Sequence, residues 1–159
     1  MGNEVRYDGG HKLDQYLRST LGQFVEWVPV CPEVECGLPI PREAMDLVGA
    51  PDSPRLVTRV TGRDYTDRMV QWANDKLKAL EKEELCGFVF KARSPSCGVH
   101  DTKIYFRSGR LADRRAGIFA ETVMGRFPLM PVEDEEGLQD PDIREHFIER
   151  VFAYHSRKV

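Results

Sequence analysis

Residues 56–92 read LVTRVTGRDYTDRMVQWANDKLKALEKEELCGFVFKA, and their hydrophobic period changes twice. Apolar and polar residues alternate over 56–61, which predicts a strand. The apolar residues of 65–82 then recur at helical spacing, and Asp64 stands where a helix cap is expected. Residues 86–92, CGFVFKA, are a short apolar run typical of a buried strand. A strand, a helix and a second strand in this order favour an α/β fold.

Further elements extend the alternation on both sides. Upstream, the apolar run 24–30, FVEWVPV, predicts a buried strand, and the Pro- and Gly-rich residues after it predict a loop as far as position 54. Downstream, the sequence predicts a strand at 103–106, a helix at 111–124, a strand at 129–132 and a helix that begins at Asp140-Pro141. We therefore expect one α/β domain over residues 1–159, a three-layer sandwich with a mostly parallel sheet.

Composition narrows the class of protein. The 159 residues carry a formal net charge of −3, which disfavours a dedicated nucleic-acid binder. No stretch approaches the roughly 20 apolar residues that span a bilayer, and the polar N-terminus has no apolar signal core, so we expect a cytoplasmic protein that binds no membrane. Four cysteines in such a chain do not suggest a disulfide scaffold, which leaves buried thiols or metal ligands.

The candidate functional residues lie directly after two of the predicted strands. The first runs into Cys31-Pro32-Glu33, and the second into a turn that holds Ser94, Ser96 and Cys97. Because ligands gather beyond the carboxyl ends of strands in open α/β sheets, these two loops are expected to meet at one site. The cysteine spacing does not specify a zinc ribbon, so inert buried thiols, a metal site and a redox pair all stay open.

Two other features allow both a functional and a plain structural interpretation. Glu33 in a pocket would move protons near neutrality, but an isolated glutamate is more often a cap or a surface carboxylate. The run Arg6-Tyr7-Asp8-Gly9-Gly10 permits close backbone approach to a ligand, and it equally suits a tight turn before a helix from about Leu13. The run is not a GxGxxG motif, so a dinucleotide site has little support.

Taken together, several motifs resemble the thiouracil desulfidase family, long known as a domain of unknown function. The resemblance extends in order from the first residues to about position 154. It is carried by RYDGGHK, VPVCPEVECGLPIPRE, GRDYT, GFVFKARSPSCG, GIFAETVMGRFP and DPDIREHFIERVFAY.

This resemblance implies an oxygen-sensitive 4Fe–4S enzyme that converts 2- or 4-thiouracil to uracil and hydrogen sulfide without net redox change. The cysteines of VCPE and SPSCG, Cys31 and Cys97, would be cluster ligands, and Glu33 and Ser94 would be the catalytic pair. We assign substrate binding to the following residues: Tyr7, Asp8, Gly9 and Ser96. The expected partner is a small thiolated pyrimidine; the sequence does not specify an oligomeric state.

One departure from the family pattern concerns the third ligand. Family members have a strand and a Ser-x-Cys-Leu-x-Gly turn immediately before the RYDGG run, whereas this sequence begins Met1-Gly2-Asn3. We therefore expect an N-terminally truncated domain with two of the three cluster thiolates. Desulfuration of thiolated nucleosides or tRNA is the alternative activity, and a non-catalytic thiol- or zinc-binding module is the alternative class.

Overall fold

The structure is a computed structural model that describes residues 2–10 and 14–158. Its strands form a four-stranded sheet in the order β2-β1-β4-β5 and a two-stranded sheet of β3 and β6. The strands are β1 (Met45–Val48), β2 (Arg55–Thr58), β3 (Phe88–Phe90), β4 (Thr102–Tyr105), β5 (Leu111–Arg115) and β6 (Val132–Asp134).

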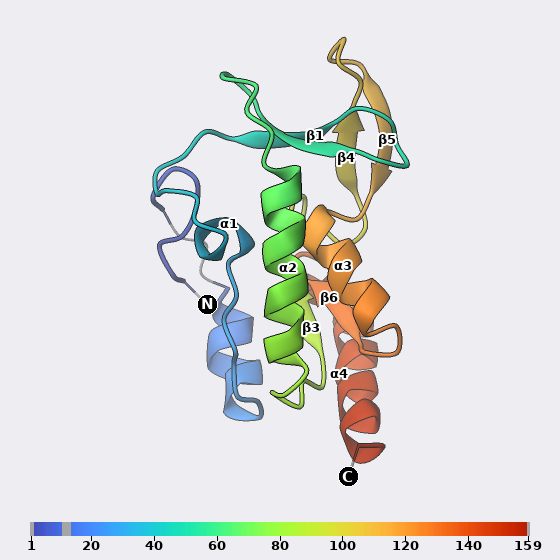
Figure 1. Cartoon of the computed structure of the whole chain (residues 1–159). Coiled ribbons are helices and arrows are strands. Elements are labelled where there is room, and N and C mark those ends of the chain that lie inside the picture. The colour runs from blue at the N-terminus through green and yellow to red at the C-terminus, as the bar shows by residue number, and fades with distance from the viewer. Residues whose placement is uncertain (1, 11–13, 159) are drawn as a thin grey trace.

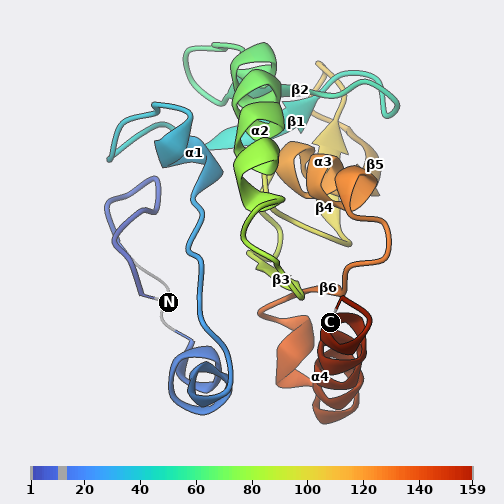
Figure 2. The ribbon, with the colours of Figure 1, turned by 60° about the horizontal axis from the view of Figure 1, so that its bottom comes forward.

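Four α-helices accompany the sheets. They are α1 (Pro32–Glu35), α2 (Thr66–Leu80), α3 (Ile118–Arg126) and α4 (Pro141–Ser156), with the short turns η1 (Tyr16–Thr20), η2 (Leu21–Gln23) and η3 (Gly137–Gln139). Helices α2 and α3 lie side by side, and β3 and β6 lie between them and α4 (Figures 1 and 2). The two-stranded sheet therefore has helices on both faces. The four-stranded sheet has helices on one face only in the described part of the chain.

The helix predicted at 65–82 is confirmed as α2. Its buried residues Met69, Ala73, Leu77 and Leu80 follow helical spacing. They join two hydrophobic clusters, because one end of α2 packs on the four-stranded sheet and the other on α3 and β3. The final helix is confirmed as α4, where the carboxylate of Asp140 accepts from the backbone N–H groups of Asp142 and Ile143.

The α/β class is confirmed, but the expectation of a mostly parallel sheet holds only in part, because the four-stranded sheet is mixed. In the four-stranded sheet only β1 and β4 pair in parallel, while β1–β2 and β4–β5 are antiparallel. The links at 49–54 and 106–110 are too short for a helical crossover, so each must join antiparallel neighbours. The strands β3 and β6 do pair in parallel.

Three element predictions are also wrong. Residues 24–30 pair with no strand, and Val25 and Trp27 pack on the cluster that holds Leu17 and Phe147. Residues 111–124 are not one helix, because 111–115 form β5 and α3 begins only after Gly117. The loop predicted as far as position 54 contains the strand β1, which was missed because Pro and Gly residues lie on both sides of it. The predicted helix start near Leu13 lies outside the described residues.

No helix of the described residues is long and apolar enough to cross a membrane.

Candidate functional site

The short helix α1 positions the first thiol. Cys31 is its N-cap residue, and Pro32 occupies the first helical position, where a missing N–H costs nothing. The carboxylate of Glu35 accepts from the Cys31 backbone N–H at 3.1 Å. This geometry places Cys31 Sγ 3.6 Å from Glu33 Oε2 and 4.0 Å from the carbonyl oxygen of Val5.

The turn after β3 positions the second thiol, and the start of α3 holds that turn. The Ser96 carbonyl accepts from the backbone N–H groups of Phe119 (2.9 Å) and Ala120 (3.1 Å). Ser94 Oγ accepts from the backbone N–H of Ser96 at 3.3 Å and of Cys97 at 3.2 Å. Because its backbone is fixed from both sides, the turn presents its serine and cysteine side chains in one arrangement.

Gly117 is the residue that permits this approach of α3. A Cβ at this position would lie 2.5 Å from the Ser96 carbonyl carbon and 2.7 Å from its oxygen. Both atoms belong to the backbone, so they cannot move aside as a flexible side chain would. The fixed turn therefore depends on a glycine at the entrance to α3.

We expect Gly117→Ala to destabilise the protein by about 2–3 kcal/mol, which lowers Tm by roughly 5–10 °C in a chain of this size. The matched control is Gly125→Ala on the same helix, where nothing lies within 4 Å of the added methyl. Since alanine favours a helix more than glycine does, the control should raise Tm slightly. Differential scanning calorimetry checks both; equal Tm values for the two variants would contradict the steric argument.

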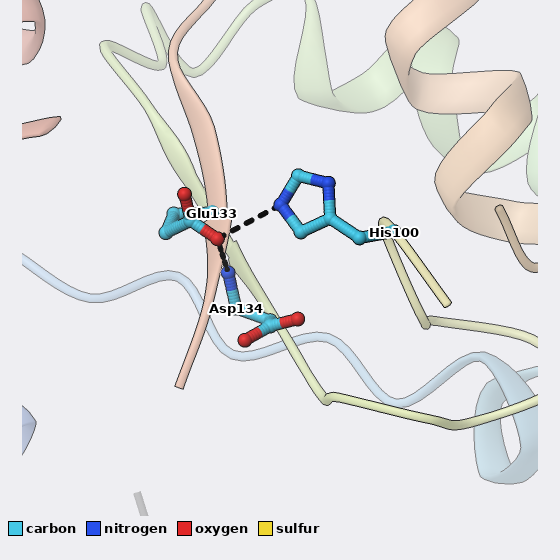
Figure 3. Close-up of side chains that lie close together, drawn as sticks. All are labelled: His100, Glu133 and Asp134. Atoms are coloured by element: carbon cyan, nitrogen blue, oxygen red, sulfur yellow. Dashed lines mark hydrogen bonds and ion pairs between the residues drawn. The ribbon is translucent and has the colours of Figure 1, made fainter. Parts of the chain in front are cut away.

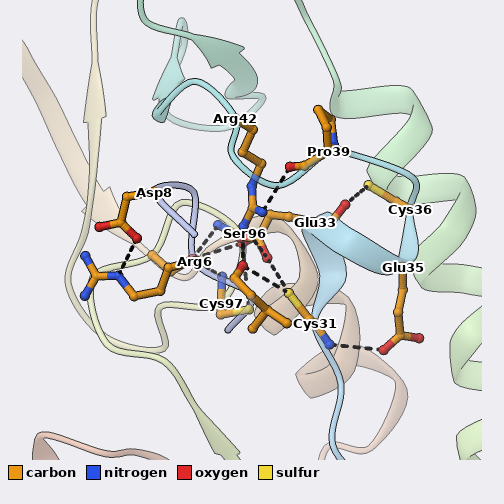
Figure 4. A network of polar contacts seen from close by, with 12 residues as sticks. Arg6, Asp8, Cys31, Glu33, Glu35, Cys36, Pro39, Arg42, Ser96 and Cys97 are labelled. Carbon is orange, nitrogen blue, oxygen red and sulfur yellow. Dashed lines mark hydrogen bonds and ion pairs between the residues drawn. The ribbon is translucent and has the colours of Figure 1, made fainter. Parts of the chain in front are cut away.

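Glu33 and Ser96 join the two loops, although 63 positions separate them in the chain. Ser96 Oγ donates to Glu33 Oε1, lies 2.9 Å from Ser94 Oγ and lies 3.7 Å from Cys97 Sγ. Figure 4 shows Cys31, Glu33, Ser96 and Cys97 gathered at one point. The two predicted loops thus meet, and both candidate ligands flank a single carboxylate.

The electrostatics at this point disfavour free thiolates. Burial raises the pKa of the Cys31 thiol to about 11, and the Glu33 carboxylate raises it further. Burial, again with Glu33, raises the pKa of Cys97 well above its usual value. Such thiols keep their protons unless a nearby cation compensates the negative charge of the thiolates. A soft metal ion bound directly to the two sulfur atoms would be such a cation. The donor set therefore fits two corners of an iron–sulfur cluster.

Cys36 does not belong to this arrangement. Its Sγ lies 3.3 Å from the Glu33 carbonyl oxygen, and the residue packs in the cluster beneath the four-stranded sheet. Cys86 lies elsewhere, next to α4. In the described residues, the site thus has the thiols of Cys31 and Cys97 only.

Arg42 is a site residue that the sequence analysis missed. Its side chain is 9% exposed; Nη2 lies 3.9 Å from Glu33 Oε2 and donates to the Val5 carbonyl at 3.1 Å. Nη1 reaches the Pro39 carbonyl at 3.5 Å. An arginine in a Pro-rich loop carries no sequence signal of such a role, because its importance depends on which side chains the fold brings beside it.

The RYDGG run forms a tight turn next to the site. The Gly9 N–H donates to the Arg6 carbonyl at 3.0 Å, and Gly9 has a positive φ of 81°. Asp8 accepts from the Gly10 N–H at 3.0 Å, which lowers the pKa of Asp8. The side chain of Tyr7 is 46% exposed, while its carbonyl accepts from the Arg42 N–H at 2.7 Å. The turn is therefore joined to the site through Arg42.

A second cluster of possible metal ligands lies near β6 (Figure 3). His100 Nε2 lies 3.0 Å from Glu133 Oε1, which also accepts from the Asp134 N–H at 2.9 Å. Asp134 Oδ1 accepts from the backbone N–H groups of Glu136 and Gly137. These carboxylates hold the loop into η3, so their contacts have a structural explanation.

The fold is of the mixed α/β class, and its paired thiols beside a carboxylate are a donor set that suits a metal. The chain belongs to the 2-thiouracil desulfurase family, which matches residues 1–135. A solved structure described as a [4Fe-4S]-dependent thiouracil desulfidase, TudS, has a TM-score of 0.69 and 28% identity, and the match covers 93% of this chain and 92% of that one. The uncharacterized protein YbbK of Bacillus subtilis (strain 168) is 28% identical over 102 residues, 61% of this chain and 67% of YbbK.

Proposed function

We propose that this protein is a 4Fe–4S-dependent desulfidase that converts 2- or 4-thiouracil and water to uracil and hydrogen sulfide. The observation that carries the proposal is the single carboxylate, Glu33, which Ser96 and Arg42 hold between the half-buried thiol of Cys31 and the buried thiol of Cys97. Cys31 and Cys97 would hold the cluster. Family membership and the 4Fe–4S dependence stated for TudS support the cofactor and the substrate class.

A third cluster thiolate would reach the site from the segment before the RYDGG turn. The segment before the RYDGG turn passes the site, since the Val5 carbonyl oxygen lies 4.0 Å from Cys31 Sγ and accepts from Arg42. The resemblance to the family implies a third cluster cysteine immediately before this turn. A cysteine there would approach the same point as Cys31 and Cys97.

When bound, a cluster with an open iron supplies a soft Lewis acid that suits a thiocarbonyl sulfur better than an oxygen. Glu33 is placed to act as the general base. Its Oε1 accepts from Ser96, whereas Oε2 has only the longer contacts to Cys31 Sγ at 3.6 Å and Arg42 Nη2 at 3.9 Å, so Oε2 is the oxygen that would take a proton from an attacking water. A C–O bond then forms at the ring carbon and the C–S bond breaks, with no change of net oxidation state.

The hydroxyl groups of Ser96 and Ser94 continue a proton path that begins at the Glu33 carboxylate. Glu33 Oε1, Ser96 Oγ and Ser94 Oγ form a continuous chain of hydrogen bonds. Outward transfer needs the hydroxyls to turn, so that protonated Glu33 donates to Ser96, Ser96 donates to Ser94, and the Ser94 hydroxyl proton passes to the departing sulfur. The proton taken from water thereby replaces the one given up, and the product is hydrogen sulfide. Ser94, which the family resemblance pairs with Glu33, would give its proton to the departing sulfur. Ser96 is 0% exposed, which favours holding Glu33 over direct contact with the pyrimidine.

The experiment that tests the proposal is anaerobic purification with iron and sulfide reconstitution, followed by assay of hydrogen sulfide release from 2- and 4-thiouracil. We expect release only from the reconstituted protein. The same assay on an extended chain that carries the family's upstream cysteine is expected to show higher iron content. A colourless protein that binds zinc and releases no sulfide would instead indicate a thiol- or zinc-binding module. Sulfide release from thiolated tRNA alone would show that the substrate is a nucleic acid and not a free pyrimidine.

Arg42→Met is expected to lower the rate of sulfide release about ten- to hundredfold, as loss of a partner that orients an active group commonly does. The guanidinium holds both Glu33 and the Val5 segment, and methionine retains its bulk without the charge. The cluster's visible absorption should persist. The control is Arg68→Met, which removes a single contact to the Gly37 carbonyl at 3.2 Å. Equal rates for both variants would show that Arg42 has no positioning role.

A further inference from the structure

Cys86 and His155 form a thiol–imidazole pair at the opposite end of the fold from the proposed active site. Cys86 Sγ lies 3.3 Å from His155 Nδ1, and the two residues are 69 positions apart in the chain. The sulfur also lies 3.3 Å from the Glu84 carbonyl oxygen. The proposed function uses neither residue, and the pair contains two of the side chains from which proteins build nucleophiles.

The backbone around Cys86 is fixed against α4, so the pair is not a chance approach of two mobile side chains. A Cβ on the adjacent Gly87 would lie 2.8 Å from Val151 Cγ2 and 3.4 Å from Phe147 Cζ, which means that helix and strand touch here. Lys158 Nζ donates to the Leu85 carbonyl at 2.9 Å and secures the same junction from the other side.

Further contacts fix the positions of the two residues. His155 lies in the last turn of α4, and Lys158 Nζ is bound to the carbonyl of Leu85, the residue before the thiol. Glu83 and Glu84 are the acidic residues of the facing segment. Cys86 is half-buried and its sulfur contacts lie at the surface, so a small molecule can reach it.

The other three cysteines offer a contrast. Cys36 and Cys97 are buried, so a small molecule in solvent does not reach their sulfur atoms. Cys31 is half-buried, and its Sγ faces the Glu33 carboxylate and the Val5 carbonyl rather than an imidazole. Among the described residues, Cys86 is therefore the cysteine that is both partly exposed and in contact with an imidazole.

We propose that Cys86 is a modification site that reacts with small disulfides, with His155 as its base. The thiol proton moves to His155 Nδ1, and the Cys86 sulfur attacks one sulfur of the disulfide. A new S–S bond joins Cys86 to that half, the original S–S bond breaks, and the departing thiolate takes up a proton. The small disulfide is the oxidant: it is reduced to one free thiol and one half bound to Cys86.

The test exposes the anaerobically loaded protein to a small excess of 2,2′-dithiodipyridine at pH 7, with quenching at timed intervals and peptide mass spectrometry. The first adduct is expected on Cys86. Cys86→Ser should remove it, and His155→Gln should slow its formation by about tenfold or more. The matched control is His146→Gln, an exposed histidine on the same helix, which should react within about twofold of the parent chain.

Two outcomes would overturn the proposal: a first adduct on Cys31, Cys36 or Cys97 in the parent chain, or an unchanged rate in His155→Gln. The order of adducts in the parent chain needs no variant, so it decides the site even if a substitution loosens α4. Sulfide release from thiouracil reports on a different part of the molecule, and its absence would leave this result unaffected.

Discussion

Glu33→Gln is expected to lower the rate of sulfide release from thiouracil by at least about a hundredfold, the usual contribution of a positioned general base. Glutamine has the same shape and still accepts from Ser96 Oγ through its amide oxygen, but it cannot take a proton from water. The iron content and visible absorption should stay at the parent level, because the substitution leaves both thiols in place. Anaerobic kinetics with parallel iron analysis measure both quantities.

The control is Glu43→Gln, whose carboxylate accepts from the Thr61 N–H and hydroxyl away from the thiols. It should keep nearly the parent rate. If Glu33→Gln instead loses the absorption, then Glu33 supports the cluster rather than the proton transfer. If it keeps full activity, the proton path through Glu33, Ser96 and Ser94 is wrong.

Cys97→Ser is expected to abolish stable iron binding and, with it, all turnover. The serine oxygen is a harder and less acidic donor than sulfur, so it is a poor substitute for a thiolate on iron. Cys97 is also one of only two thiols that the described residues bring to the site. Iron and acid-labile sulfide are measured after anaerobic reconstitution.

Cys36→Ala provides the matched control, because it removes a thiol five positions from Cys31 that points to the Glu33 carbonyl instead. It is expected to retain iron while losing some stability, since a buried side chain is shortened. Loss of iron in Cys36→Ala would make Cys36 a ligand, and retention of iron in Cys97→Ser would remove Cys97 from the ligand set.

The sequence predicted both long helices and three of the six strands. The helix α2 repeats its apolar spacing over four turns, and α4 has a capping Asp140 before a proline, so both were found. The predictions at 56–61, 86–92 and 103–106 correspond to β2, β3 and β4, whereas β1 lies in a Pro- and Gly-rich stretch that indicates a loop, and β5 was joined to the helix that follows it. The apolar run 24–30 has the composition of a strand, but pairing depends on a neighbouring strand that no local pattern reveals.

The sequence predicted which two segments form the candidate site, but not the contacts between their side chains. The Cys31-Pro32-Glu33 and Ser94–Cys97 segments were assigned to one place, and the hydrogen bond from Ser96 to Glu33 joins them. Their meeting did not require the predicted strand at 24–30, because the extended segment and α1 deliver Cys31 to the same point. Arg42 was missed, and Ser96 was assigned to the substrate although its hydroxyl contacts Glu33, Ser94 and Cys97.

The hydrogen bond between Glu33 and Ser96 closes a loop of the chain that contains β1, β2, α2 and β3. An unfolded chain therefore has no preformed pocket for iron, and the affinity of the site includes the free energy of ordering everything inside that loop. Any change that weakens the fold, even far from the sulfur atoms, will also weaken iron retention. Conversely, bound iron favours the native state by mass action, so loading and thermal resistance should rise and fall together across a set of variants.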